Sequence, residues 1–459
     1  MIVSRIDRSS RYLGLIALMF AVSNSHGADI AKHVVRTRVA GIDLIVDRTD
    51  IKDVVTILGA LPAGDAFATN NAAVARLAGA LLDKGTASMD KFAIAKQLGQ
   101  TGAQLRFTVE AQAVTMQGRS LTADLPRVLT ILADELRHPA FREEEFDKAK
   151  IELLGDLQQK SENTEFRAEE TLSRAMFPPG HPNRQASLEE WRDAIDRARL
   201  ADVKEFYGKT YGPAHMVLVL VGDLDISQVQ AEVAKYFHGW SGGVPYLTAS
   251  KTLVPNASDQ LVSLAGKTSV TLLMGEATGL RYQDADSLPL RAGVAILGNG
   301  FTSRLMGTVR DKEGLTYHIV ASVDDDSFDD GDWRINASFA PALLDRGLSS
   351  VHRELERWWQ DGINADELKS RKTNMIGSFQ VGLSTTGGLA ATLLHTVQRG
   401  LPLSWIDEYT KSVDTLTLEQ VNGAIRRYVD PHKLNIVEAG SVMAAPAQPT
   451  ALRGRDQNL

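Results

Sequence analysis

Apolar residues recur along the chain with two different periods, and the pattern predicts short strands alternating with amphipathic helices. In residues 122–137 the apolar side chains return every three or four positions, which is the spacing of one helical face. Short β-branched runs bounded by glycine or polar residues indicate strands. In the first half we predict strands at residues 35–46 (a hairpin around Gly41), 54–61, 103–109, 113–118 and 216–221, and helices at 71–82, 90–98, 122–137, 142–176, 188–194 and 200–211.

The second half of the chain repeats this plan. We predict strands at residues 270–274, 315–323, 333–339 and 434–438, and helices at 287–297, 301–313, 343–360, 365–381, 390–400, 405–412 and 418–428. A repeat of about 200 residues indicates two similar α+β domains, each a mixed sheet covered by helices. Glycines and prolines at residues 241–258 indicate a linker that could open like a hinge. The predicted division is an N-terminal domain at 28–243, a linker at 244–258 and a C-terminal domain at 259–442.

Both ends of the chain differ in composition from the rest. Arg5, Arg8 and Arg11 precede an apolar run at residues 12–22, which is too short to span a membrane and predicts a signal peptide at residues 1–27. An uncleaved anchor is the alternative. No second long apolar run follows, so we expect an exported chain without a membrane span, in the periplasm if the source is Gram-negative. Residues 443–459 are rich in alanine, proline and polar residues, and we predict a disordered tail.

Composition excludes several classes of function. The 459 residues carry a net charge of −7, and the basic residues are dispersed, so nothing predicts nucleic-acid binding. The chain contains no cysteine, which excludes disulfides, thiolate metal sites and a cysteine nucleophile. A chain of this length can bury enough apolar surface to be stable without such cross-links.

The segment from Phe301 to Tyr317 carries the candidate chemistry. A short helix after Gly300 is predicted to end at Gly314, and a strand is predicted to follow. Arg310 lies near the helix end and Tyr317 near the strand start, so a helix–turn–strand unit can bring both to one cleft. Guanidinium and phenol are both hydrogen-bond donors and could together hold a peptide carbonyl and its developing oxyanion. The plainer interpretation is a surface arginine and a half-buried tyrosine on an ordinary unit.

The order Ser-Arg-Leu, Val-Arg and Lys-Glu-Gly-Leu-Thr-Tyr within residues 303–317 resembles a signature of the pitrilysin/insulinase family of zinc peptidases, the inverzincins. The resemblance implies that Arg310 and Tyr317 bind the substrate near the scissile bond. It also implies a clam-like fold in which two homologous α+β halves enclose a peptide. The similarity of plan extends over nearly the whole chain, from residue 35 to residue 439.

The metal motif of that family is missing. Active members carry His-x-x-Glu-His on a helix, in which two histidines bind zinc and the glutamate activates water. When the chain is aligned on Lys84-Gly85-Thr86, the histidine positions hold Arg76 and Ala80, and the glutamate position holds Gly79. The family's third ligand falls near Asp156, which we interpret as a solvated helix residue. We therefore predict that none of these degenerate positions is a metal ligand and that this chain holds no cofactor.

Other metal-binding patterns are weak. None of the ten histidines forms a two-histidine helical pair. His352 is interpreted as surface charge, and His318 as a packing residue, because it should point away from Tyr317 on a strand. The acidic residues between positions 324 and 332 could bind calcium, but their spacing does not match an EF-hand, and a solvated hairpin loop is the favoured interpretation.

Some members of the family are heteromers in which one subunit supplies the zinc motif and a homologous subunit supplies the Arg/Tyr pair. This sequence resembles the second kind. We therefore expect a chain that is inactive alone, and that contributes Arg310 and Tyr317 to peptide hydrolysis beside a homologous zinc-bearing subunit. The alternative is a non-catalytic scaffold or peptide-binding subunit of the same fold.

Overall fold

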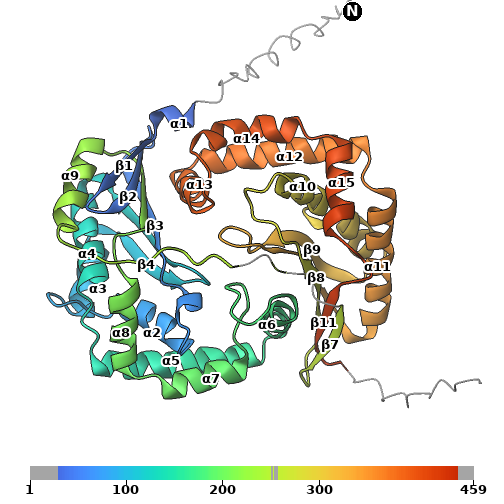
Figure 1. Cartoon of the computed structure of the whole chain (residues 1–459), viewed down its shortest axis with the longest axis horizontal. Coiled ribbons are helices and arrows are strands. Elements are labelled where there is room, and N and C mark those ends of the chain that lie inside the picture. The colour runs from blue at the N-terminus through green and yellow to red at the C-terminus, as the bar shows by residue number, and fades with distance from the viewer. Residues whose placement is uncertain (1–28, 250–251, 253–256, 443–459) are drawn as a thin grey trace, which may run out of the picture.

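The computed structural model of the chain describes residues 29–249, 252 and 257–442 (Figure 1). The predicted signal peptide at residues 1–27 and the predicted tail at 443–459 lie outside these residues. Two α+β halves are present, as the repeat predicted, with a mixed sheet in each half. Within the described residues, no helix combines the length and the apolar character needed to cross a membrane.

The N-terminal half is built on a six-stranded sheet in the order β1-β2-β6-β3-β5-β4. Only β2 and β6 run parallel, and the other neighbours are antiparallel. The central strand β6 is buried at all six positions, because helices cover both faces of the sheet there. The elements are α1 (Ile30–His33), β1 (Val35–Val39), β2 (Ile42–Arg48), β3 (Val54–Leu61), α2 (Ala73–Leu81), α3 (Lys91–Thr101), β4 (Gln104–Val109), β5 (Val114–Leu121), α4 (Leu125–Arg137), α5 (Glu143–Ser161), α6 (Thr164–Met176), α7 (Leu188–Arg197), α8 (Leu200–Thr210), β6 (Val217–Gly222) and α9 (Ile226–Tyr236).

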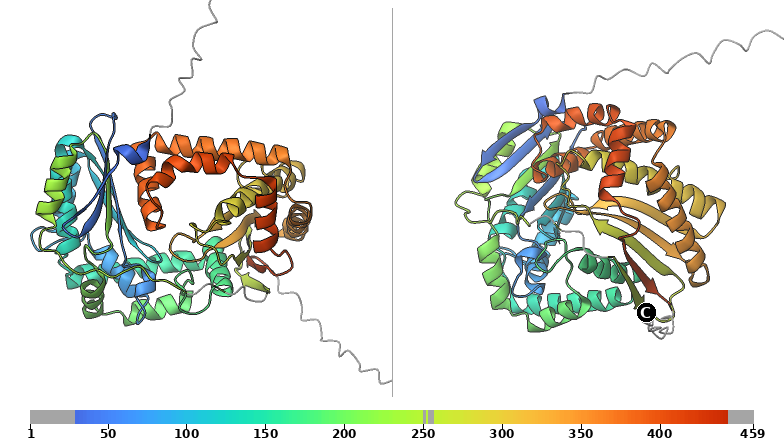
Figure 2. Two further views of the ribbon diagram at one scale, coloured as in Figure 1. Left: turned by 45° about the horizontal axis from the view of Figure 1, so that its top comes forward. Right: turned by 45° about the vertical axis from the view of Figure 1, so that its right-hand side comes forward.

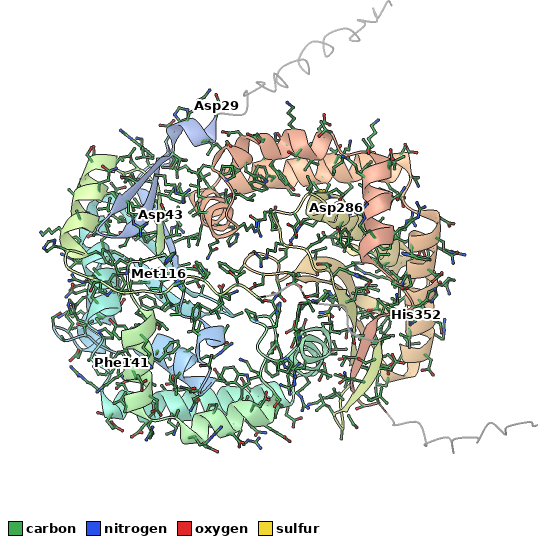
Figure 3. The ribbon with its side chains drawn as sticks, viewed as in Figure 1. Asp29, Asp43, Met116, Phe141, Asp286 and His352 are labelled. Atoms are coloured by element: carbon green, nitrogen blue, oxygen red, sulfur yellow. The ribbon has the colours of Figure 1, made fainter. Side chains whose placement is uncertain are left out.

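The C-terminal half repeats this topology in a five-stranded sheet, β7-β11-β8-β10-β9. This sheet also contains one parallel pair, β7 and β11, and its other neighbours are antiparallel. No strand corresponds to β1, so here the parallel pair lies at the edge of the sheet. The elements are β7 (Ser258–Ser263), β8 (Val270–Ala277), α10 (Ser287–Gly298), a π-helix (Met306–Lys312), β9 (Thr316–Asp324), β10 (Asp332–Phe339), α11 (Leu344–Asp361), α12 (Ala365–Leu383), α13 (Thr386–Gln398), α14 (Ser404–Asp414), α15 (Leu418–Tyr428) and β11 (Asn435–Gly440). Figure 3 places Met116 in the first sheet and His352 on α11 at the far side of the second half.

Glycines at equivalent positions mark the duplication. Gly222 ends β6 and Gly440 ends β11, and both have a φ of +152°. A β-carbon on Gly222 would lie 2.1 Å from the carbonyl oxygen of Val54, and one on Gly440 would lie 2.8 Å from that of Ser269. Both positions therefore require glycine, because the neighbouring strand approaches too closely for any side chain.

Each sheet is covered on one face by a helix from the other half. Helix α6 packs on strands of the second sheet through Ala168, Leu172 and Met176. Figure 1 shows this helix beside β11. In return, α13 buries Leu393 and its apolar neighbours on β3 and β6 of the first sheet (Figure 2). Separating the halves would expose both contacts to water, so the packing opposes a hinge at residues 241–258.

Most of the acidic segment between β9 and β10 is buried, with Asp325 exposed, so its interpretation as a solvated loop is wrong. Asp329 and Asp330 are each only 1% exposed. Asp329 accepts hydrogen bonds from the backbone N–H of Ala249 at 2.7 Å and from the amide of Gln112. Asp330 accepts from the backbone N–H of Thr252 at 3.0 Å. These carboxylates therefore fasten the linker and the N-terminal half to the C-terminal half.

Three local predictions also differ from the structure. The single helix predicted at 142–176 is two helices, because Asn163 interrupts it and caps α6 by accepting a hydrogen bond from the N–H of Phe166. Helix α9 and strand β7 were not predicted. The spacing of Ile226, Val229 and Val233 is that of a helical face, so the sequence did carry a signal for α9, whereas β7 is a short, largely polar strand. The helix predicted at 301–313 is largely the π-helix.

Candidate functional site

Arg310 lies in the π-helix that precedes β9. The N–H of Glu313 donates to the carbonyl of Thr308, five residues earlier, at 3.0 Å, which gives the wider π turn. The guanidinium of Arg310 has few contacts: Nη1 is 3.4 Å from the sulfur of Met306, and Nε is 3.9 Å from a carboxylate oxygen of Asp311. The Phe301 ring lies 5.8 Å from it, measured to the ring centroid. The charge of Arg310 is therefore available to a ligand.

Tyr317 lies in a β-bulge at the start of β9. Thr316 pairs with Phe339 and His318 pairs with Ser338, so Tyr317 is the extra residue between two successive pairs. The buried Thr316 hydroxyl donates to the carbonyl of Ser338 at 2.5 Å and accepts from the N–H of His318 at 3.1 Å, which stabilises the bulge. Tyr317 points outward and is 94% exposed, not half-buried. Bulges commonly redirect a side chain in this way at functional sites.

The bulge also overturns the interpretation of His318. Strict alternation along a strand would place His318 opposite Tyr317 and inside the domain. Both residues are exposed, because the extra residue interrupts the alternation. His318 is therefore not a packing residue.

Arg310 and Tyr317 line one pocket of about 380 Å³. The helix–turn–strand arrangement predicted from the sequence thus brings the two donors to the same place. The rest of the lining comes from the π-helix and the turn after it, the start of β9, the end of β10 and the segment that follows β10. It consists of Asp311, Gly314, Leu315, Thr316, Ser338, Ala340 and Leu343. The two side chains are presented to solvent, where an extended peptide could reach both.

The degenerate metal positions lie on α2, where an ion pair occupies the place of a ligand. Arg76 forms a forked ion pair with Asp65, with Nη2 2.6 Å from a carboxylate oxygen. The guanidinium also lies 5.0 Å from the ring centroid of Trp191. Burial raises the pKa of Asp65, and the charge of Arg76 opposes that rise. A cation bound in this way cannot be a metal ligand.

The glutamate position is closed by packing. Gly79 is buried, and a β-carbon there would lie 2.3 Å from Cγ2 of Val109 on β4. Ala80 is exposed but has only a methyl group to offer. No side chain at either position can bind a metal or transfer a proton.

Asp156 lies on α5 and lines a larger pocket of about 750 Å³, together with Asp65, Arg76 and Lys160. Burial and the nearby charge of Arg76 lower the pKa of Lys160. Asp156 itself is exposed. Across the described ranges, no group of three or more histidine and carboxylate side chains is arranged to hold a metal ion. The residues at the family's metal position therefore do not fit zinc.

Two family models match the chain. Residues 49–186 match insulinase (peptidase family M16), and residues 197–375 match the peptidase M16 inactive domain. A relative from Helicobacter pylori, described as the non-peptidase homolog YmxG, is 23% identical over 376 residues, which cover 80% of this chain and 84% of the relative.

Solved structures show the same fold. The peptidase M16 inactive domain from Pseudomonas fluorescens has a TM-score of 0.82 at 24% identity, covering 90% of this chain and 99% of that one. The periplasmic protease PqqL from Escherichia coli has a TM-score of 0.69 at 13% identity, and the match covers 87% of this chain but 44% of PqqL.

Proposed function

The chain belongs to the insulinase (M16) peptidase family as a member that lacks the zinc motif, and we propose that it is the zinc-free subunit of an exported heteromeric zinc peptidase. One contrast carries the proposal. Arg310 and Tyr317 are both present and line one open pocket. At the metal position, by contrast, Arg76 is held in an ion pair and Gly79 packs closely against a neighbouring side chain. Half of a peptidase site is present.

The comparison with PqqL agrees with a peptidase site that is divided over two units of this fold. The matched region accounts for less than half of PqqL, which is described as a protease. A single chain of that length can hold two units of the present size. We infer that the missing half is supplied here by a separate homologous chain that carries the zinc motif.

In the proposed complex, the partner's zinc would supply the activated water. The residues of this chain act on the substrate carbonyl. The guanidinium of Arg310 and the hydroxyl of Tyr317 donate hydrogen bonds to the carbonyl oxygen, and these bonds strengthen as negative charge develops on it. The π-helix and the bulge fix the places at which the two side chains leave the backbone.

A second candidate is a scaffold or peptide-binding subunit without a catalytic role. The description of the Helicobacter pylori relative as a non-peptidase homolog favours it. In that case Arg310 and Tyr317 bind peptide but do not accelerate its hydrolysis.

The test is to measure zinc content and peptide cleavage of the purified chain alone, and then mixed with a zinc-motif homologue from the same source. We expect no zinc and no cleavage alone, and cleavage above the homologue's own rate on mixing. Zinc-dependent activity of the isolated chain would refute the proposal. A stable complex without any gain in cleavage would favour the scaffold. The exported location is tested separately, by fractionating cells that express the full chain.

A further inference from the structure

We propose that Thr316 is a positioning residue for Tyr317, and that its buried hydroxyl keeps the Tyr317 side chain turned outward. The inference rests on the proposed function, in which the phenol binds the substrate carbonyl, and adds the group that places the phenol. Thr316 is only 6% exposed, so it acts through its neighbour rather than on the peptide.

The Tyr317 side chain does not fix its own direction. It is 94% exposed, so little of the ring packs against the domain. A side chain with so few packing contacts takes its direction from the backbone that carries it. The conformation of the bulge therefore decides whether the phenol is presented to a substrate.

A regular strand would turn Tyr317 the other way. Ile319, Ala321 and Val323 of β9 are buried at alternate positions. When this alternation is extended back from Ile319 without a bulge, it places Tyr317 on the same inner face. In the structure Thr316 takes that inner place, and Tyr317 is the extra residue of the bulge. The register of this short segment thus decides which of the two neighbours faces outward.

The Thr316 hydroxyl favours the bulged register. It lies 2.5 Å from the carbonyl oxygen of Ser338 on β10 and 2.8 Å from that of His318, and it accepts from the N–H of His318 at 3.1 Å. A bulge interrupts the backbone pairing of two strands, so a hydroxyl that contacts both strands replaces part of the lost pairing. A buried hydroxyl also needs such partners. Removing this hydroxyl should therefore weaken the bulge and the outward direction of Tyr317.

The first test follows the position of residue 317 in the chain alone, without partner or substrate. The chain contains no cysteine, so Tyr317→Cys introduces a single thiol whose reaction with a soluble aromatic disulfide reports its exposure. Thr316→Ala and Thr316→Ser are a matched pair, because alanine and serine differ only by the hydroxyl oxygen. Combined with Tyr317→Cys, Thr316→Ala should slow the labelling about 10-fold or more, whereas Thr316→Ser should leave the rate within about 2-fold.

Lys312→Cys is the control for the labelling, because Lys312 is an exposed position of the π-helix that precedes the bulge. Thr316→Ala should not change the labelling rate of that thiol. A general loosening of the domain would instead alter both rates.

The second test measures peptide cleavage by the complex with the zinc-bearing homologue. Thr316→Ala should lower kcat/KM about 10-fold or more, and Thr316→Ser should stay within about 2-fold of the wild type. In a Tyr317→Phe background, Thr316→Ala should have no further effect, because the donor that it positions is already absent. A merely structural role would lower the rate equally in both backgrounds.

The two tests separate this inference from the proposed function. Unchanged labelling in the Thr316→Ala variant would overturn the positioning role, and so would an equal loss of cleavage in both backgrounds. The proposed function would survive either result, provided that Tyr317→Phe slows cleavage. If Tyr317→Phe leaves cleavage unchanged, the phenol is not a donor to the substrate, and the proposed function fails together with the role of Thr316 in it.

Discussion

Gly79 on α2 and Val109 on β4 pack so closely that a β-carbon on the glycine would lie 2.3 Å from Cγ2 of the valine. This contact occupies the place where an active member of the family carries its general-base glutamate. The chain therefore lacks the side chains of the metal motif, and the packing around Gly79 also leaves no space for a new side chain there. Restoring the glutamate would also require the Val109 side chain to move or to be replaced by a smaller one.

Gly79→Ala should destabilise the fold, although alanine is the better helix former by about 1 kcal/mol. Overpacking against the β-branched Val109 should dominate, and we expect a net loss of about 1–2 kcal/mol in the free energy of unfolding, measured by urea denaturation. Gly155→Ala in α5 is the matched control, because no atom lies within 4 Å of its added β-carbon. That variant should be neutral or stabilised. Adding Val109→Ala to Gly79→Ala should relieve part of the loss, and strict additivity would contradict the steric explanation.

Arg310→Ala and Tyr317→Phe should each lower peptide cleavage by the complex about 10²–10³-fold, the usual effect of removing an oxyanion donor. Tyr317 is 94% exposed and Arg310 has no ion pair closer than 3.9 Å, so neither change should alter the thermal transition. Lys312→Ala and His318→Ala are controls at exposed neighbouring positions. Wild-type rates in both site variants would remove the pair from the mechanism.

Asp329→Ala should loosen the attachment of the two halves. The substitution leaves the backbone N–H of Ala249 and the amide of Gln112 without their buried acceptor, which should cost about 3 kcal/mol or more. Asp329→Asn keeps one carbonyl oxygen and should lose less. Limited proteolysis should cut residues 244–249 faster in the alanine variant than in the asparagine variant. Equal cleavage rates in all three proteins would show that this carboxylate does not hold the linker.

Glu276 should make the chain less stable as the pH rises toward neutrality. Burial raises the pKa of Glu276 to about 7, opposed by hydrogen bonds from the backbone N–H of Asp430 and the indole of Trp333. The folded chain thus keeps a proton that the unfolded chain loses above pH 4.5, the usual pKa of such a carboxyl. Its stabilising effect is complete below pH 4.5 and is lost by about pH 7, a change of about 3 kcal/mol.

Glu276→Gln should flatten this part of the stability profile, measured by urea denaturation between pH 4.5 and 8. Glu152→Gln at an exposed position of α5 is the control and should follow the wild-type profile. An unchanged slope in the Glu276 variant would show that the carboxyl does not titrate in this range.

The sequence by itself determined the plan of the fold and identified Arg310 and Tyr317 as the candidate substrate-binding residues. Periodic apolar positions are local signals, so strands such as β3 and helices such as α4 were predicted close to their observed bounds. The order of residues from Ser303 to Tyr317 was enough to indicate Arg310 and Tyr317. The substitutions at Arg76, Gly79 and Ala80 were equally visible in the sequence.

Only the tertiary structure decided how these pieces act on one another. The bulge at Tyr317 depends on its register with β10, and the exclusion of a side chain at Gly79 depends on the approach of β4. The acidic residues at 324–332 looked solvated because charge is normally exposed, but Gln112 and the linker N–H groups bind Asp329 and Asp330 from far along the chain. Such effects arise from contacts between distant residues, which local periodicity and composition do not encode.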